Sequence, residues 1–199
     1  MQIQTAIRAA SLRQPGTRLP SGSLPRSRPN ADVIEVMGTV MPFARNCEIY
    51  GENEPAEYLY KVISGTVRTY KVLADGRRQI GAFHMPGDVF GFETGEEHTF
   101  SAEAITDCKI VVIKRTALMA VAERDNEVAR YILALTTREL QRAQAHMLLL
   151  VKSAQERVAT FLLEMAEQVS TRGTVELSMS RQDIADYLGL TIETVSPHA

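Results

Sequence analysis

The sequence predicts an α+β protein in which a region of antiparallel β-strands precedes a helical region. Short apolar runs interrupted by turn residues occupy residues 33–115, and a helical pattern without Gly or Pro occupies residues 125–169. Two further helix signals, separated by a glycine, follow at 180–196. Strands broken by a turn about every eight to twelve residues favour an antiparallel barrel or sandwich, and apolar spacings of three and four favour helices.

Length, charge and cysteine content exclude several classes of protein. The chain has 199 residues with 22 basic and 24 acidic side chains, a net charge of -2, which suits one or two domains. No apolar run approaches the ~20 residues of a membrane span. Cys47 and Cys108 are too few for a disulfide scaffold or a four-ligand zinc or iron–sulfur site. The near-neutral balance argues, at first sight, against a nucleic-acid binder.

Residues 1–32 differ in composition from the rest of the chain. They hold five Arg and a single acidic residue, Asp32, among repeated Pro, Gly and Ser. Such a segment has no helical or strand period and little to bury, so we expect a disordered basic tail. A basic arm on DNA and a targeting peptide are the alternatives. The segment lacks the apolar stretch of a secretory signal.

Residues 33–124 are predicted to form the first folded domain. Five runs predict strands, at 58–63, 66–72, 79–83, 89–92 and 108–113. Gly65, Gly76 and Pro86-Gly87-Asp88 mark turns between them. A short helix is expected at 116–123, at the end of this domain.

A long helix is predicted over 125–152, with a break near Ser153. Apolar residues form a stripe along it, and a helix of this length has few ways to bury such a stripe within one small chain. We therefore expect a seam between the helices of a homodimer. Packing of the helix on its own β domain is the alternative. The predicted seam residues are Val128, Ile132, Leu135, Ala143, Met147 and Leu150.

Residues 180–196 have the spacing of a helix-turn-helix. Ser180 can cap the first helix, with Asp183 three residues on, and Gly189 stands at the turn. The second helix of this motif enters the DNA major groove, whereas a plain helical hairpin is the alternative. Glu193 is expected to accept from a cytosine amino group and Ser196 to contact a base or phosphate. The full set of predicted DNA-binding residues is Arg181, Thr191, Glu193, Thr194 and Ser196.

Over residues ~38–197 the chain resembles the CRP/FNR family of transcription regulators, most of all its FixK-type branch. The resemblance rests on Ile63-Ser64-Gly65-Thr66-Val67, Gly76, Pro86-Gly87-Asp88-Val89-Phe90-Gly91 and the 180–196 motif. It implies a β-roll like that of cyclic-nucleotide-binding domains, a dimerisation helix, and a winged helix-turn-helix over 153–199. It also implies a cytoplasmic, homodimeric, non-enzymatic activator of nitrogen-fixation or microaerobic respiration genes. Its partners would be a palindromic site in double-stranded DNA and RNA polymerase.

Two departures from the family bear on its ligands. Members that bind cyclic AMP carry a Glu after the Pro-Gly-Asp turn and an Arg-Ser pair later, where this chain has Phe92 and His98-Thr99. A phenyl ring cannot accept a hydrogen bond from the ribose hydroxyl, and a neutral imidazole is a poor partner for phosphate. Oxygen-sensing members hold an iron–sulfur cluster with N-terminal cysteines, and no cysteine precedes Cys47. We expect no small-molecule effector, no cofactor and no metal. We expect both cysteines to be buried thiols of the core.

The third departure concerns the recognition helix. The family pattern Glu-x-x-Ser-Arg ends here with Pro197 in place of Arg, two residues before the last residue, Ala199. A proline ends a helix, so a truncated domain without its wing, and with impaired DNA binding, is expected. The alternative function is a dimeric sensor or interaction module that does not bind DNA but binds a small ligand or a full-length relative.

Overall fold

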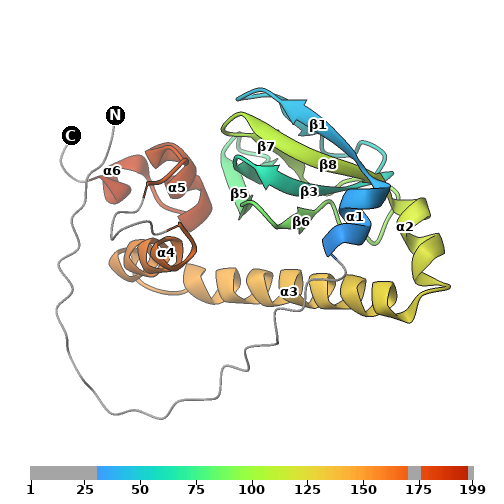
Figure 1. Cartoon of the computed structure of the whole chain (residues 1–199). Coiled ribbons are helices and arrows are strands. Elements are labelled where there is room, and N and C mark those ends of the chain that lie inside the picture. The colour runs from blue at the N-terminus through green and yellow to red at the C-terminus, as the bar shows by residue number, and fades with distance from the viewer. Residues whose placement is uncertain (1–30, 170–175, 197–199) are drawn as a thin grey trace, which may run out of the picture.

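The computed structural model describes residues 31–169 and 176–196. The chain elements follow one another in the order shown in Figure 1. Their bounds are α1 Ala31–Met37, β1 Thr39–Phe43, β2 Glu48–Tyr50, β3 Tyr58–Ser64, β4 Val67–Val72, β5 Arg78–His84, β6 Val89–Phe90, β7 Ser101–Ala104, β8 Cys108–Lys114, α2 Arg115–Ala122, α3 Asn126–Leu150, α4 Ala154–Val169, α5 Arg181–Leu188 and α6 Ile192–Val195.

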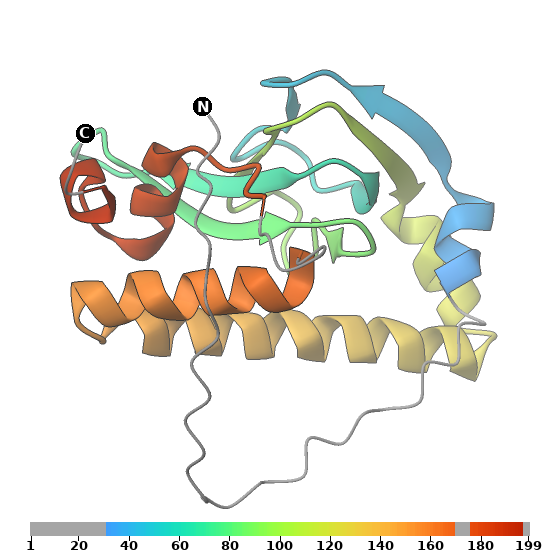
Figure 2. The same ribbon diagram turned by 60° about the vertical axis from the view of Figure 1, so that its left-hand side comes forward.

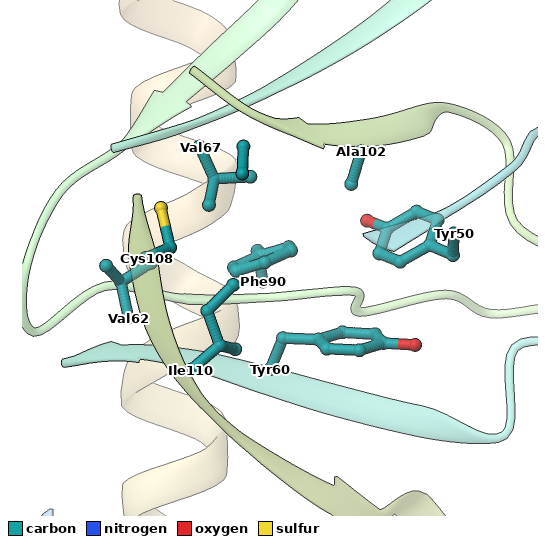
Figure 3. Packing of buried hydrophobic residues seen from close by; sticks show 9 residues of the cluster. Tyr50, Tyr60, Val62, Val67, Phe90, Ala102, Cys108 and Ile110 are labelled. Atoms are coloured by element: carbon teal, nitrogen blue, oxygen red, sulfur yellow. The ribbon is translucent and has the colours of Figure 1, made fainter. Parts of the chain in front are cut away.

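The strands form a β-roll of two four-stranded sheets. One sheet has the order β1-β8-β3-β6 and the other β2-β7-β4-β5, and the pairs within each sheet are antiparallel. Each of the five predicted strand runs corresponds to a strand, which confirms the antiparallel β prediction. The inner faces of the two sheets enclose an apolar core, which Figure 3 shows from close by. Residues of this core include Tyr50, Tyr60, Val62, Val67, Phe90 and Ile110.

Helix α1 was not predicted, because residues from 33 onward were expected to be β. The helix forms because Ile34 is fully buried in a second apolar cluster with Leu59 and Leu118. Gly38 then lets the chain pass close to β8, since a Cβ at this position would lie 2.2 Å from a methyl carbon of Val111. The remainder of the predicted basic tail, residues 1–30, lies outside the described residues.

The helical region follows the predicted order. Helix α2 occupies the short segment expected at 116–123, and α3 begins after Asp125, whose carboxylate accepts from the backbone N–H of Val128 at 3.4 Å. The break expected near Ser153 is present between Leu150 and Ala154, where the Ser153 N–H donates to the Glu156 carboxylate at 3.0 Å. Among the described residues, no helix combines the length and apolarity needed to cross a bilayer.

Helix α3 runs along the β-roll and beside α4 (Figure 2). Its first half contacts the roll of its own chain: Val128 is 1% exposed and Leu135 9%, and Ile132 packs on the same cluster. Of the other predicted seam residues, Ala143 and Met147 are exposed and Leu150 is half-buried. The alternative of packing on the own β domain therefore describes the first half of the helix. In the second half Ala143 and Met147 are exposed, whereas Leu149 is buried.

A third apolar cluster joins the C-terminal helices to the outer face of the β2-β7-β4-β5 sheet. Ile80 and Phe83 of β5 belong to it, together with Phe161 of α4 and Ile184 and Leu188 of α5. Figure 1 shows α5 lying beside β5. The roll and the C-terminal helices therefore share a core.

Candidate nucleic-acid interface

The start of α5 has the predicted capping box. The Ser180 hydroxyl accepts from the Asp183 N–H at 3.0 Å, and the Asp183 carboxylate accepts from the Ser180 N–H at 3.1 Å and its hydroxyl at 2.7 Å. These bonds satisfy backbone donors that the first helical turn would otherwise leave without partners. The helix therefore begins at a position that its local sequence defines.

The turn between α5 and α6 is built on Gly189. This residue has φ 61° and ψ 41°, the left-handed conformation that glycine adopts readily. The next N–H, that of Leu190, donates to the Ala185 carbonyl at 3.0 Å, and Ala185 is fully buried at the helix crossing. The predicted role of Gly189 in the turn of a helix-turn-helix is therefore confirmed.

A residue that the sequence analysis missed, Arg157 of α4, holds this turn in place. Its guanidinium donates to the carbonyl of Leu188 at 2.9 Å and to the carbonyl of Lys152 at 2.9 Å. These bonds satisfy carbonyls at the ends of two helices. No sequence motif marks Arg157, because its partner Leu188 is 31 residues away.

Helix α6 is a single short turn of helix. Thr191 occupies its N-cap position without a capping hydrogen bond, and its hydroxyl lies 3.2 Å from that of Thr194. At Ser196 the backbone leaves the helix, with φ -137° and ψ 76°, as expected for a residue that precedes proline. Pro197, His198 and Ala199, which carried the prediction of a truncated end, lie outside the described residues.

The predicted DNA-binding residues lie on α6 and at the start of α5. Thr191, Glu193 and Thr194 are exposed, whereas Arg181 and Ser196 are half-buried. The pKa of Glu193 is lowered, first by its own backbone N–H at the helix start and then by the Thr191 hydroxyl. The side chain is therefore ionised at neutral pH and acts only as a hydrogen-bond acceptor.

Aromatic rings occupy the interior of the β-roll. The ring centroids of Tyr50 and His98 stack at 3.6 Å, those of Tyr60 and Phe90 at 5.2 Å, and those of His84 and Phe90 at 4.7 Å. Burial raises the pKa of Tyr60 to about 12 and lowers that of His84 to about 4. These side chains therefore remain neutral and well packed at neutral pH.

The positions that the family resemblance associates with an effector have other partners in this fold. Phe92 packs against the apolar cluster of α1 and α2, and the Thr99 hydroxyl donates to Glu93 at 2.9 Å. Cys108 is buried, as predicted, but Cys47 is exposed beside β2, so its prediction as a core thiol is wrong. Among the described residues, no three His, Cys, Asp or Glu side chains gather as potential metal ligands.

Comparison with known protein families gives two matches in chain order. The cyclic nucleotide-binding domain family matches residues 40–125, and the Crp-like helix-turn-helix domain family matches residues 156–198. The first corresponds to the roll with α2, and the second begins in α4 and includes α5 and α6.

Individual relatives agree with these matches. A nitrogen fixation regulation protein FixK of Azorhizobium caulinodans is 55% identical over 172 residues, which cover 83% of this chain and 69% of the relative. FixK of Rhizobium meliloti is 45% identical over 75% of this chain and 68% of its own length. The solved structure of FixK2 from Bradyrhizobium japonicum superposes with a TM-score of 0.77 at 55% identity, covering 80% of this chain and 81% of that one. The chain therefore belongs to the FixK-type branch of the CRP/FNR family of transcription regulators.

Proposed function

We propose that this chain is a homodimeric, sequence-specific DNA-binding regulator, an activator of nitrogen-fixation or microaerobic respiration genes. The observation that carries the proposal is the difference in burial between the two helices of the helix-turn-helix. Helix α5 is held in a buried core by Ile184, Ala185 and Leu188, while Thr191, Glu193 and Thr194 of the α6 segment remain exposed. The FixK relatives, named as nitrogen fixation regulators, support the choice of target genes.

Within the DNA interface we assign different roles to the exposed and half-buried residues. Glu193 and Ser196 would contact bases, because the N-terminal side chains of a recognition helix meet the base edges. An ionised Glu193 suits the amino group of cytosine. Thr191 and Arg181 would contact phosphates and fix the register on the duplex. Thr194 lies beside Thr191 and completes the polar surface.

The dimer seam is proposed to lie on the exposed face of α3. Leu133, Leu140 and Met147 recur at intervals of seven residues, and Val151 follows four residues later. All four side chains are exposed in the single chain, Leu140 to 58%. An apolar repeat of seven is the pattern of a coiled-coil seam. This seam keeps Met147 of the predicted set, with Ala143 and Leu150 beside it, and replaces Val128, Ile132 and Leu135.

DNA binding is tested by selection from a pool of random duplexes, followed by fluorescence anisotropy. We expect enrichment of a two-fold symmetric site whose half-sites lie about one helical turn apart. The enriched duplex should bind ~1,000-fold or more tightly than a scrambled duplex of equal length and salt. Recovery of no symmetric site, or equal affinity for both duplexes, would contradict the proposal.

Regulation without a small-molecule effector is also proposed. It is supported by the stacked rings of Tyr50, Tyr60, Phe90 and His98, which occupy the interior of the roll. Titration calorimetry with cyclic AMP and cyclic GMP should show no binding, and DNA affinity should not change when either is added. Binding of either nucleotide would overturn this part of the proposal. The alternative of a module that does not bind DNA is not favoured by the Crp-like helix-turn-helix match.

We propose that the chain activates transcription in the cytoplasm, through contact with RNA polymerase. We assign residues 33–124 to the roll, 125–152 to the dimerisation helix and 153–199 to the DNA-binding domain. In transcription reactions with purified polymerase, the chain should raise transcript yield only from templates that carry the selected site. An equal yield with and without that site would contradict a role as activator.

A further inference from the structure

The geometry points to Arg68 and Arg78 of the β-roll as positioning residues for DNA binding. We propose that their ion pairs with Asp183 and Asp186 of α5 hold the helix-turn-helix at one orientation on the roll. This inference rests on the DNA-binding function proposed above. It adds residues that lie outside the helix-turn-helix, on a different part of the fold.

Asp183 is the centre of the contact. One carboxylate oxygen accepts from the Arg68 guanidinium at 2.5 Å and from the Arg78 guanidinium at 2.7 Å. The other oxygen accepts from Ser180 in the capping box. The Asp183 side chain is only 5% exposed. The residue that completes the capping box of α5 therefore also ties that helix to two strands of the roll.

Arg78 makes a second link one helical turn further along α5. Its guanidinium donates to the Asp186 carboxylate at 2.8 Å, and the other oxygen of Asp186 accepts from Gln182 at 2.7 Å. Asp183 and Asp186 thus bind one guanidinium from two points along the helix. Two such points restrict rotation of α5 on the sheet, which a single contact would not.

The arginines are themselves held in place by the roll. Arg68 donates to Glu103, its cross-strand neighbour on β7, at 2.9 Å. Both guanidinium groups lie 5.8 Å from the centre of the Tyr70 ring, within the range of a cation–π contact. These contacts within the roll order both guanidinium groups independently of α5. This reduces the conformational entropy that is lost when they pair with the aspartates of α5.

The ion pairs border the apolar cluster shared by β5, α4 and α5. Burial of apolar area favours contact but is not directional, whereas charged hydrogen bonds between fixed partners define a register. The cluster therefore supplies attraction between the roll and the helix-turn-helix. The arginine–aspartate pairs supply the orientation.

Orientation matters because two recognition helices must reach half-sites about 34 Å apart on one face of the duplex. Thr191, Glu193 and Thr194 remain exposed while the ion pairs are formed, so the contact presents the DNA-binding surface and does not cover it. If the pairs are lost, only part of the population has the competent orientation. The apparent affinity then falls in proportion to that part.

The central experiment compares Arg78→Gln with Arg77→Gln in the full chain. Arg77 is adjacent, 78% exposed, and pairs only with Asp75 in its own turn among the described contacts. Both variants remove one positive charge from the same strand end. We expect ~10-fold weaker binding of the selected duplex for Arg78→Gln and less than ~2-fold for Arg77→Gln. Unchanged or tighter binding by Arg78→Gln would overturn the inference.

A double-mutant cycle tests whether Arg78 acts through its partner. In an Asp186→Asn background, Arg78→Gln should reduce DNA affinity less than it does in the parent chain, because one of its links is already absent. Equal reductions in both backgrounds would contradict the assigned link to Asp186.

Hydrogen exchange without DNA separates this inference from the proposed function. In Arg78→Gln, amides of α5 and α6 should exchange faster while those of β3 and β8 in the far sheet stay unchanged. Exchange equal to that of the parent chain would overturn the positioning contact. If the parent chain itself selected no duplex, the proposed function would fail. The hydrogen-exchange comparison would still test whether Arg78 holds α5 on the roll.

Discussion

Glu193 is the residue at which DNA specificity should be most sensitive to chemistry. The change Glu193→Gln keeps the size of the side chain but replaces an acceptor-only carboxylate by an amide that also donates. We expect ~10-fold or greater loss of discrimination at one base pair of each half-site. Anisotropy with single-base variants of the selected duplex measures this loss.

The matched control for Glu193 is Glu48→Gln, the same change at an exposed position of β2. It should leave both affinity and discrimination unchanged. Equal discrimination by the parent chain and Glu193→Gln would remove Glu193 from the set of base-reading residues.

Gly65 is the residue at which the roll should be most sensitive to a single added carbon. Its φ is +88°, and a Cβ would lie 2.4 Å from the Asp107 carbonyl oxygen and 2.6 Å from the Cys108 sulfur. Gly65→Ala should therefore lower the free energy of unfolding by about 2–4 kcal/mol, through strain and overpacking. Urea denaturation measures the change.

Gly95→Ala is the comparison for Gly65→Ala, because a Cβ at Gly95 would meet no atom within 4 Å. It should change the free energy of unfolding by less than about 1 kcal/mol. Similar losses for the two variants would show that the turn at Gly65 is not under the described constraint.

At the scale of elements, the exposed face of α3 should decide the oligomeric state. Leu140→Arg places a charge in the middle of the proposed seam, where it would be buried between two chains without a partner. We expect sedimentation equilibrium to show a monomer for this variant and a dimer for the parent chain. DNA affinity should fall with the loss of the dimer.

Leu163→Arg on α4 is the control for the seam, because Leu163 is 61% exposed and lies outside it. This variant should remain dimeric. Dimers of Leu140→Arg at micromolar concentration would place the interface elsewhere on the molecule.

At the scale of the whole molecule, three histidines should make stability depend on pH. Burial lowers the pKa of His84 to about 4 and also lowers those of His98 and His146. The unfolded chain takes up these protons near pH 6.5, before the folded chain does. The contribution of these neutral histidines to stability is therefore fully present above pH 6.5 and is lost as the pH is lowered towards 4.

The contribution of His84 alone should reach about 2 kcal/mol between pH 7 and pH 5. Urea denaturation at both pH values measures it, and His84→Gln should show a smaller difference between them. An equal difference between the two pH values in the parent chain and in His84→Gln would contradict the burial of a neutral His84.

Local features of the helix-turn-helix were predictable, because they depend on residues close together in the chain. Ser180 and Asp183 are three residues apart, and the turn at Gly189 needs only one residue that tolerates positive φ. Strands β3, β4, β5, β6 and β8 were predictable for the same reason, since turn residues separate short apolar runs, whereas β1, β2 and β7 were not predicted. Helix α1 was not, because Ile34 is buried by Leu59 and Leu118, which are distant in sequence.

The proposed seam on α3 shows the limit of periodicity. The sequence contains two apolar stripes, one through Val128 and Leu135 and another through Leu133 and Leu140. Spacing does not tell which of the two packs on the roll of the same chain. Burial of Val128 and Leu135 decides this, and Leu133 and Leu140 of the second stripe are exposed in the single chain.

By itself, the sequence determined the order of the β region, the long helix and the helix-turn-helix, the capping box and turn of the helix-turn-helix, and the family. These properties are encoded by neighbouring residues and by motifs. Only the tertiary structure decided which face of α3 is free and which residues hold α5. Arg78 and Asp186 are 108 residues apart, and nothing in the spacing of either marks the other. Their pairing exists only because the roll and the C-terminal helices bury a common apolar cluster, which brings two distant charges within hydrogen-bond distance.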